Sequence, residues 1–398
     1  MTDPSALLHA FRTIRARSVA LIEGLSAEDC AAQSMPDASP AKWHLAHTTW
    51  FFETFVLETH APEFRPFHPA YRVLFNSYYN QVGDKHPRPR RGLLTRPGLE
   101  DVLLYRQHVD AAVWALLTAE PLPAPVLELL TLGLHHEQQH QELLVTDLTH
   151  LLFFNPLAPP WPAAPSLPAT LPPMAWLPLA SGVSEVGHTG TGFCYDNELP
   201  RHRTYIAPGQ IASRLVRNAE YQAFVESGGY HDQAYWLAEG WDWLQLHQRT
   251  HPLYWQRTGS QWQEFTSSGW AALNPVQATL HVSYYEADAY ARWAGARLAT
   301  EAEWEVAVLT HGCAPSGALY EVYDTAWQWT QSSYGPYPGY QPSAGAVGEY
   351  NGKFMVNQYV LRGGSAATPP GHSRPSYRNF FPAGTCWQFS GIRLARQG

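Results

Sequence analysis

Apolar residues recur at helical spacing through the first part of the chain. From Ser5 to about Phe154 they return every three or four positions, most clearly over residues 102–117 and 125–153. A stripe with this period faces a core only when the backbone is α-helical. The pattern therefore predicts four or more helices that pack as a bundle.

Residues 62–97 interrupt these helices with a long stretch that has no helical pattern. The stretch is dotted with Pro, Asn and Gly, and it ends in a run of basic residues from Arg88 to Arg96. A loop of this length inside a compact domain is usually functional. We therefore expect a substrate-binding loop here.

A proline-rich segment at residues 155–178 breaks the pattern again. Its many prolines exclude helix or central strand and favour a stiff, extended connector. After it, short apolar runs alternate with Gly, Pro and Asn, which is typical of a mixed α and β domain with little regular structure. Helical spacing returns only at residues 218–227, 284–293 and 301–309.

These changes of pattern predict two domains within 398 residues, a length that is too great for one compact core. We place a helical domain at residues 1–155, the connector at 156–178 and the mixed domain at 179–398.

The composition indicates a globular protein that can bury a large core and line deep pockets. Hydrophobic residues make up 45%, aromatic residues 13% and charged residues 15% of the chain. The formal net charge of -8 argues against a nucleic-acid or anionic-membrane partner, since either would require an excess of Lys and Arg. Neither a stretch of eighteen apolar residues nor a signal peptide is evident, so we expect no membrane association. Four widely spaced cysteines favour a reducing cytoplasm.

Two histidines in the last predicted helix have the spacing of a metal chelate. His136 and His140 are four residues apart, so their imidazoles project from one face of the helix about a turn apart. With Glu137 between them they also satisfy the H-E-x-x-H pattern of zinc metalloproteases, in which the Glu activates a water. His150 follows ten residues after His140, but it lacks the glycine turn of the extended protease motif.

A third histidine is available upstream. His47 lies among apolar and aromatic residues in a predicted helix, and three histidines from two helices can bind one metal and leave positions open. A buried histidine is more often held by an ordinary hydrogen bond than by a metal. Spacing alone leaves His44 and His135 as competitors for the same roles.

Motifs along nearly the whole chain resemble those of the ergothioneine-type sulfoxide synthases, a family that includes the sister selenoneine synthases. The resemblance implies a multidomain fold, with a DinB-like four-helix bundle followed by a C-type-lectin-like domain of the formylglycine-generating-enzyme type. It rests on residues 42–53, 75–79, 86–92, 136–142, 297–305, 327–330, 362–365 and 391–395.

The resemblance also implies an activity. In this family a non-haem Fe(II) ion is held by three histidines, which here correspond to His47, His136 and His140, so the resemblance favours His47 over His44. The family enzymes are oxidoreductases of ergothioneine biosynthesis. They use O2 to join a thiol to C2 of the hercynine imidazole and oxidise the sulfur to a sulfoxide.

The resemblance and the residue types point to further candidate residues near the substrates. Tyr78 and Tyr79 correspond to a tyrosine pair near the iron, where a phenol can donate a proton or hydrogen atom. Arg88 and Arg91 would bind substrate carboxylates through bidentate hydrogen bonds. Asn379 and Trp387 are candidate contacts to hercynine, and Gln139 is a candidate contact to the hercynine imidazole or to the sulfoxide. For each aromatic residue, plain core packing is the competing interpretation.

The sequence departs from the family pattern at positions that bear on the sulfur donor. Members that use γ-glutamylcysteine carry an acidic residue where this chain has Phe380 and Phe381, which suggests free cysteine as the donor. Gln328 replaces the Glu of a Trp-Glu-Trp motif, and the paired cysteines of formylglycine-generating enzymes are absent, so formylglycine chemistry is not expected.

Three alternatives stay open on sequence alone. The same site would serve a selenoneine synthase, which forms a C–Se bond between hercynine and a selenosugar. A zinc-binding hydrolase or thiol transferase of the DinB type would retain the three histidines. A non-enzymatic binding module would use them only for stability. The oligomeric state and the tyrosine that acts are not fixed by the sequence.

Overall fold

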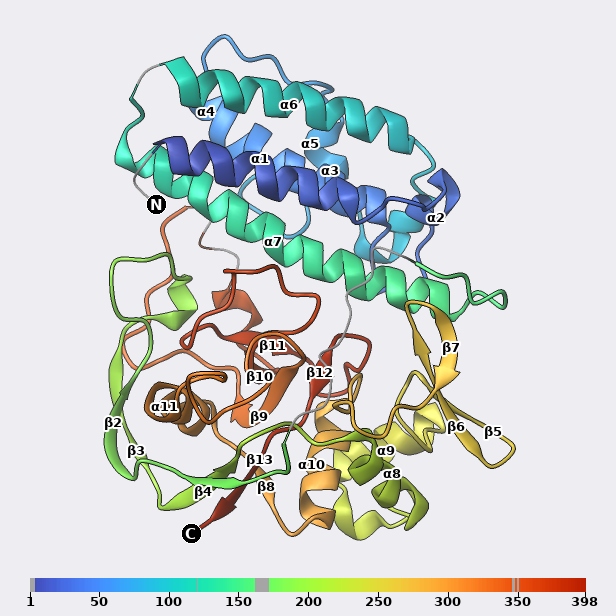
Figure 1. Ribbon diagram of the computed structural model, residues 1–398. Helices are drawn as coiled ribbons and strands as arrows, with labels where there is room; N and C mark the ends of the chain where they lie inside the picture. Colours follow the sequence, from blue (N-terminus) through green and yellow to red (C-terminus); the bar gives the residue numbers. More distant parts are fainter. Residues whose placement is uncertain (1–3, 120, 162–171, 346–347, 349–350) are drawn as a thin grey trace. The chain divides into compact units, whose positions relative to one another are not determined.

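The computed structural model describes residues 4–119, 121–161, 172–345, 348 and 351–398, which form two compact units (Figure 1). The helical unit comprises Met1–Ala164 with Thr191–Phe193 and Ala344–Tyr350, and the mixed unit comprises the rest. Residues 162–171 of the predicted connector lie outside the described residues. Its limits therefore stay a prediction.

Four long helices build the helical unit, as the apolar pattern predicted. They are α1 (Pro4–Ala20), α3 (Ala41–Phe51), α6 (Leu99–Ala119) and α7 (Ala124–Phe153). Helices α1, α6 and α7 run side by side, and α3 packs against α6 and α7 (Figure 1). Every residue of α3 is buried, so this helix forms the centre of the unit.

A π-helical segment, η1 (Phe52–Leu57), continues α3 towards the short α4 (Glu58–His60). Helix α7 approaches this segment closely at Gly133, where a Cβ atom would lie 2.6 Å from the ring of Phe52. Only glycine leaves room for this contact. The approach fixes α7 one turn before His136, and π-helical turns occur frequently at functional sites.

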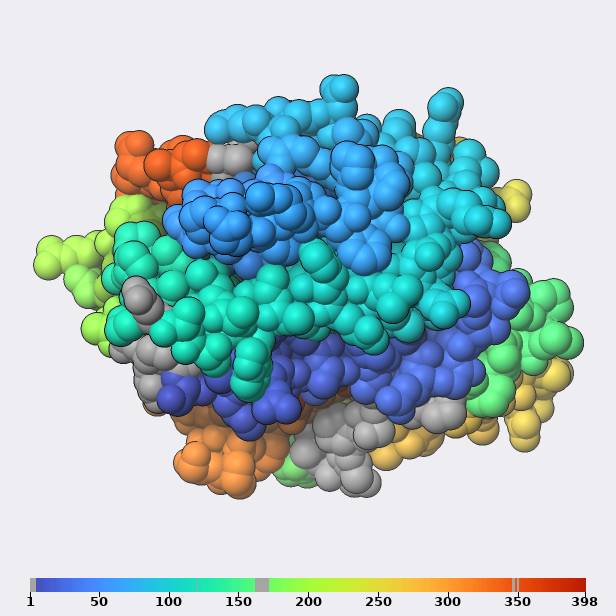
Figure 2. Space-filling view, turned by 90° about the horizontal axis from the view of Figure 1, so that it is seen from above, coloured from blue at the N-terminus to red at the C-terminus, as the bar shows by residue number. Residues whose placement is uncertain are grey.

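The stretch at residues 62–97 is mostly loop, but it contains two short helical turns that the sequence pattern did not predict. These are α5 (Tyr71–Leu74) and the 3-10 helix η2 (Arg88–Leu93). The segment after α4 lies on the surface next to α6, where Figure 2 shows it in light blue to cyan. A further short helix, α2 (Ala27–Ala31), precedes α3.

Short strands dominate the mixed unit. Among the described residues they form four sheets, with the strand orders β1-β4-β13-β8, β11-β10-β9-β12, β2-β3 and β5-β6-β7. The bounds are β1 (Trp176–Pro178), β2 (Gly182–Val186), β3 (His202–Ile206), β4 (Gly209–Ala212), β5 (Trp255–Thr258), β6 (Gln261–Thr266), β7 (Gly269–Ala272), β8 (Arg297–Leu298), β9 (Trp327–Ser333), β10 (Tyr359–Gly363), β11 (Asn379–Phe381), β12 (Ser390–Gly391) and β13 (Leu394–Gln397).

The three helices predicted for this unit are present as α8 (Asn218–Glu226), α10 (Tyr284–Trp293) and α11 (Glu301–His311). The expectation that helical pattern is confined to them was wrong, because α9 (Ala238–His247) is a fourth helix. Its apolar residues do not form a buried stripe, since Leu246 is 79% exposed, so the periodicity gave little signal.

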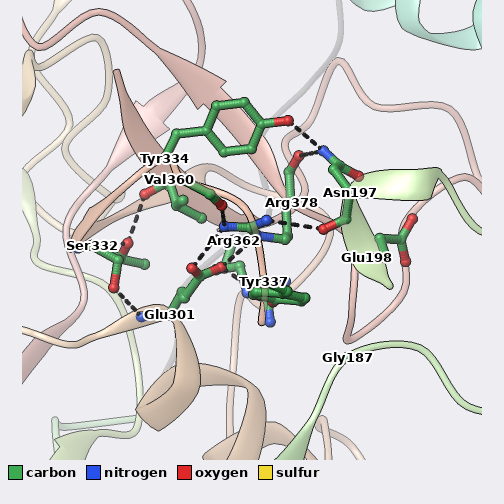
Figure 3. Close-up of polar contacts among 12 residues, drawn as sticks. Gly187, Asn197, Glu198, Glu301, Ser332, Tyr334, Tyr337, Val360, Arg362 and Arg378 are labelled. Carbon is green, nitrogen blue, oxygen red and sulfur yellow. Dashed lines mark hydrogen bonds and ion pairs between the residues drawn. The ribbon is translucent and has the colours of Figure 1, made fainter. Parts of the chain in front are cut away.

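Buried arginines connect the loops of the mixed unit. Arg378 pairs with Glu301 at 2.8 and 2.9 Å and donates to the carbonyl of Asn197 at 2.9 Å (Figure 3). A further N–H of Arg378 donates to the carbonyl of Gly335 at 2.9 Å. Arg362 likewise pairs with Glu305 and donates to two loop carbonyls. Buried carbonyl oxygens need hydrogen-bond donors, and short strands provide few backbone N–H groups for them. The guanidinium groups fill this deficit.

Gln328 lies fully buried in the same core. Its Oε1 accepts hydrogen bonds from Trp304 and Arg393, both at 2.6 Å, while its Nε2 donates to the carbonyls of Glu321 and Val322. A glutamate could not donate these bonds. The Gln at this position therefore has a structural explanation within the mixed unit.

The helices that the structure describes include none long and apolar enough to cross a membrane.

Candidate metal centre

Three histidines meet in the core of the helical unit. His47 comes from α3, and His136 and His140 come from one face of α7. One ring nitrogen of each lies within 4.8 Å of the others, and all three side chains are buried. The described residues thus contain a three-histidine site of the kind that binds a metal ion.

The hydrogen bond of His47 determines which of its nitrogens faces the others. Its Nδ1 lies 2.6 Å from the carbonyl oxygen of Phe75, and a carbonyl only accepts, so Nδ1 carries the proton. Nε2 of His47 therefore presents a lone pair, 3.2 Å from Nε2 of His136. Two nitrogens that each bind one ion at about 2.1 Å are roughly 3.0–3.4 Å apart for angles from 90° to tetrahedral. The observed separation fits a shared ion.

Burial keeps the three imidazoles neutral. It lowers the pKa of His136 to about 4, and it lowers the pKa values of His47 and His140 well below the usual range, with neighbouring histidines adding to the effect. Neutral imidazole is the form that binds metals. The site is therefore ready to accept a cation near neutral pH.

Aromatic rings restrict the movement of the three histidines. Trp43 and Trp50 stack on His47, with ring centroids 4.6 and 5.5 Å away, and Phe51 lies 4.9 Å from His136. A rigid, apolar surround holds imidazoles in position and keeps bulk water out.

Glu137 does not face this site as a catalytic base would. It is fully buried and accepts hydrogen bonds from Arg15 at 2.9 Å, Arg106 at 2.8 Å and Ser18 at 2.6 Å. Burial raises its pKa, but the two arginines outweigh burial and hold the pKa at about 2. A carboxylate engaged in this way cannot take up a proton from water. The protease-like pattern is thus a structural ion cluster between α1, α6 and α7.

The loop after α5 carries the predicted tyrosine pair. Asn76 holds this loop from within, because its Nδ2 donates to the carbonyls of Tyr79, Gly83 and Asp84 at 3.1–3.2 Å. Tyr79 is buried, with its ring 5.6 Å from Trp50, whereas Tyr78 is half-buried. The neighbouring Phe75 carbonyl orients His47, so one loop serves both a histidine and the tyrosines.

The two predicted arginines differ in their surroundings. Arg88 is exposed, whereas Arg91 is buried beneath the ring of Trp43, 3.3 Å from its centroid. One N–H of Arg91 donates to Ser39 at 2.9 Å. Its Nε–H is buried and has no hydrogen-bond partner within the part of the chain that the structure describes. Burial lowers the pKa of Arg91 to about 9.

The other predicted contacts are spread over both units. Gln139 is half-buried on α7. In the mixed unit, Asn379 begins β11, Phe380 stacks on Tyr334 with centroids 4.1 Å apart, and Trp387 is half-buried. Phe381, which ends β11, is half-buried as well.

Two further residues lie beside the site, and the sequence analysis considered one of them, His44, only as a competing metal ligand. His44 lies 2.9 Å from both His140 and Asp147, and Asp147 had not been considered. Asp147 follows His140 by seven residues on α7, which places it on the same helix face two turns along. That spacing was the available signal.

Comparison with known proteins places both units in known families. A model of the DinB superfamily matches residues 10–144, and a model of the sulfatase-modifying factor enzyme 1-like domain matches residues 165–324 and 315–398. The hercynine oxygenase of Mycobacterium tuberculosis is 31% identical over 438 residues, which cover 99% of each chain. The chain belongs to the ergothioneine-type sulfoxide synthase family.

Other relatives agree with this assignment. The hercynine oxygenase of Mycolicibacterium smegmatis is 30% identical, with 96% of each chain covered. Ergothioneine biosynthesis protein 1 of Schizosaccharomyces pombe is 25% identical over 51% of this chain and 28% of its own length. Members of the ergothioneine-type sulfoxide synthase family are oxidoreductases, so this chain is an enzyme. The predicted order of a DinB-like and a formylglycine-generating-enzyme-like domain is confirmed.

Proposed function

We propose that the protein joins the sulfur of free cysteine to C2 of the hercynine imidazole and oxidises that sulfur to a sulfoxide. One O2 is consumed, the C2–H and S–H bonds are broken, and the second oxygen atom leaves as water with both hydrogens. The observation that carries the proposal is the convergence of His47, His136 and His140 in a chain similar over its length to a hercynine oxygenase.

The proposed metal is iron(II), held by the three histidines. Iron with three neutral imidazole ligands would supply open coordination positions for a thiolate and O2. The protein's own contribution is to keep these imidazoles neutral and fixed, through burial and through the Trp43 and Trp50 rings.

Hydrolysis on zinc is the less favoured function. A zinc hydrolase of the H-E-x-x-H type needs its Glu as a base beside the metal-bound water. Glu137 is instead engaged by Arg15 and Arg106. This arrangement supports a redox role for the histidines over a hydrolytic one.

Within the proposed reaction, Tyr78 is favoured over Tyr79 as the proton or hydrogen-atom donor. Tyr79 is packed against Trp50 and Phe55 as part of the aromatic wall, whereas Tyr78 is half-buried and its charge would raise the pKa of Arg91. Because Tyr78 is partly open to solvent and its charge acts on Arg91, its phenol is the better placed of the two to meet a substrate that Arg91 binds.

Arg91 and Arg88 are proposed to bind the cysteine carboxylate. The buried Nε–H of Arg91 suits a carboxylate oxygen, since a buried donor is costly to leave unpaired. Arg88 lies three residues earlier on the same 3-10 helix and is open to solvent. Gln139, Asn379 and Trp387 are proposed to contact hercynine, and Phe380 and Phe381 to favour free cysteine over γ-glutamylcysteine.

An oxygen electrode tests the proposal directly. Protein loaded with iron under anaerobic conditions is expected to consume O2 only when hercynine and cysteine are both present, with a hercynyl cysteine sulfoxide as the product. The variant His140→Ala should lose this activity by more than 100-fold, whereas Glu128→Gln, an exposed change on the same helix, should keep it.

The donor arms of the experiment discriminate the alternatives. If γ-glutamylcysteine or a selenosugar supports turnover and cysteine does not, the proposed donor is wrong, while the proposed metal site still stands. If no donor supports O2 consumption with hercynine, the proposed reaction is wrong.

A further inference from the structure

His44 bridges a proposed metal ligand and a buried carboxylate. It lies one turn before His47 on α3, and its Nδ1 is 2.9 Å from Nδ1 of His140. Its Nε2 is 2.9 Å from Oδ2 of Asp147. All these side chains are at least 90% buried, so solvent does not compete for the hydrogen bonds.

The carboxylate determines where the protons lie. An ionised carboxylate only accepts hydrogen bonds, so Nε2 of His44 must carry its proton. A neutral imidazole has a single N–H, which leaves Nδ1 of His44 as an acceptor. The proton of the 2.9 Å contact therefore belongs to Nδ1 of His140. His140 consequently presents its lone pair at Nε2, as His47 does.

Asp147 is itself fixed in position. Its Oδ2 also accepts the backbone N–H of Ser39 at 2.7 Å, just before α3 begins. The hydroxyl of Ser39 accepts from Arg91, which lies on Trp43, and Trp43 stacks on His47. A continuous set of contacts thus connects His140 with His47 on the side of the site that lies between α3 and α7.

We infer that His44 and Asp147 are positioning residues that fix the tautomer and the ring orientation of His140. The inference rests on the proposed function, because it treats His140 as a metal ligand. Both nitrogens of His44 are engaged, so His44 is not itself a ligand. Partners at the second nitrogen of a ligating imidazole raise its basicity, and their loss typically weakens metal binding by about 10–100-fold.

Cobalt(II) titration of the metal-free protein tests this inference, because bound Co2+ reports its coordination through visible absorption. His44→Ala is expected to weaken Co2+ binding by about 10–100-fold. His44→Gln, whose side-chain carbonyl can accept from His140, should recover part of the loss. Wild-type affinity in His44→Ala would overturn the inference.

His150→Ala is the matched control. His150 is also a buried histidine of α7, and its Nδ1 is hydrogen-bonded to Ser34 at 2.7 Å. This variant should keep Co2+ affinity within about threefold. An equal loss in His150→Ala would show that loosening of α7 explains the effect, and the inference would fall.

A measurement on the wild-type chain does not depend on whether any variant folds. Nitrogen-15 NMR of the imidazoles in the Zn2+-loaded protein should show His44 as the Nε2–H tautomer, and the Nδ1–H tautomer would contradict the inference. The proposed metal site fails separately if wild type and His140→Ala bind Co2+ equally. Where His140→Ala loses Co2+ and His44→Ala does not, only the role of His44 is wrong.

Discussion

At the scale of single residues, the same sequence motif can be catalytic or structural, and the hydrogen-bond and ion-pair partners of its side chains decide which it is. Glu137 stands between two histidines as the base of a protease would, yet it pairs with Arg15 and Arg106. Both arginines lie far away in sequence, on α1 and α6. Local spacing contains no information about them.

Glu137→Gln should lower the free energy of unfolding by about 3–5 kcal/mol, because it leaves the buried Arg106 without a carboxylate and leaves Arg15 with Asp110 alone. Urea unfolding followed by circular dichroism measures the change. The exposed control Glu128→Gln should stay within about 0.5 kcal/mol of wild type. If the unfolding midpoint is unchanged and turnover is completely lost, Glu137 acts in catalysis and the structural interpretation is wrong.

The site was predictable in its principal residues and not in its surroundings. Helical spacing identified His136 and His140, and the family resemblance selected His47 over His44. The structure brings these three together. Some partners that orient these histidines are backbone atoms, such as the carbonyl oxygen of Phe75. Any residue type would supply the same atom, so the sequence does not reveal the contact.

At the scale of elements, apolar periodicity recovered the long helices because apolar residues return at helical spacing in each, although α1 and α6 bury one face and α3 is buried on all sides. It missed α9, whose apolar residues are partly exposed, and the short turns α5 and η2, which have too few residues to show a period. The π-helical turn η1 was also outside its reach. Its first residue, Phe52, meets α7 at Gly133, a contact between elements that the periodicity of one segment does not reveal.

Gly133→Ala tests that approach. In an exposed helix the change would stabilise by about 1 kcal/mol through helix propensity. Here the added Cβ would lie 2.6 Å from Phe52, so we expect a net loss of about 1–3 kcal/mol in thermal unfolding. Gly335→Ala, where a Cβ meets open space, should be neutral or slightly stabilising. If Gly133→Ala is more stable than wild type, the ring of Phe52 can move aside at little cost and the prediction is wrong.

At the scale of the whole molecule, stability at mildly acidic pH depends on buried neutral histidines in both units. In the mixed unit, His281 lies 4.6 Å from the ring of Tyr254 and 4.7 Å from that of Phe389. Burial lowers its pKa from 6.5 to about 4. The unfolded chain therefore binds the proton first as the pH falls below 6.5, and the fold loses stability progressively down to about pH 4.

His281→Asn removes the contribution of His281 to this dependence and suits the backbone, because residue 281 has a φ of 60°, which Asn tolerates well. Between pH 7.5 and 4.5 the variant should lose less stability than wild type, by a difference of up to about 3 kcal/mol in urea unfolding. The exposed control His231→Asn should follow wild type. Parallel curves for all three proteins would refute the prediction.

The internal guanidinium groups of Arg362, Arg378 and Arg393 also bear on how this kind of domain diversifies. They bind main-chain carbonyls, which every amino acid possesses alike. Because these bonds do not depend on the side chains of the loops, substitutions in those side chains can change the chemistry of the surface while the interior contacts stay the same. The constraint then falls on arginine positions such as these three, where lysine has too few fixed donors to take over.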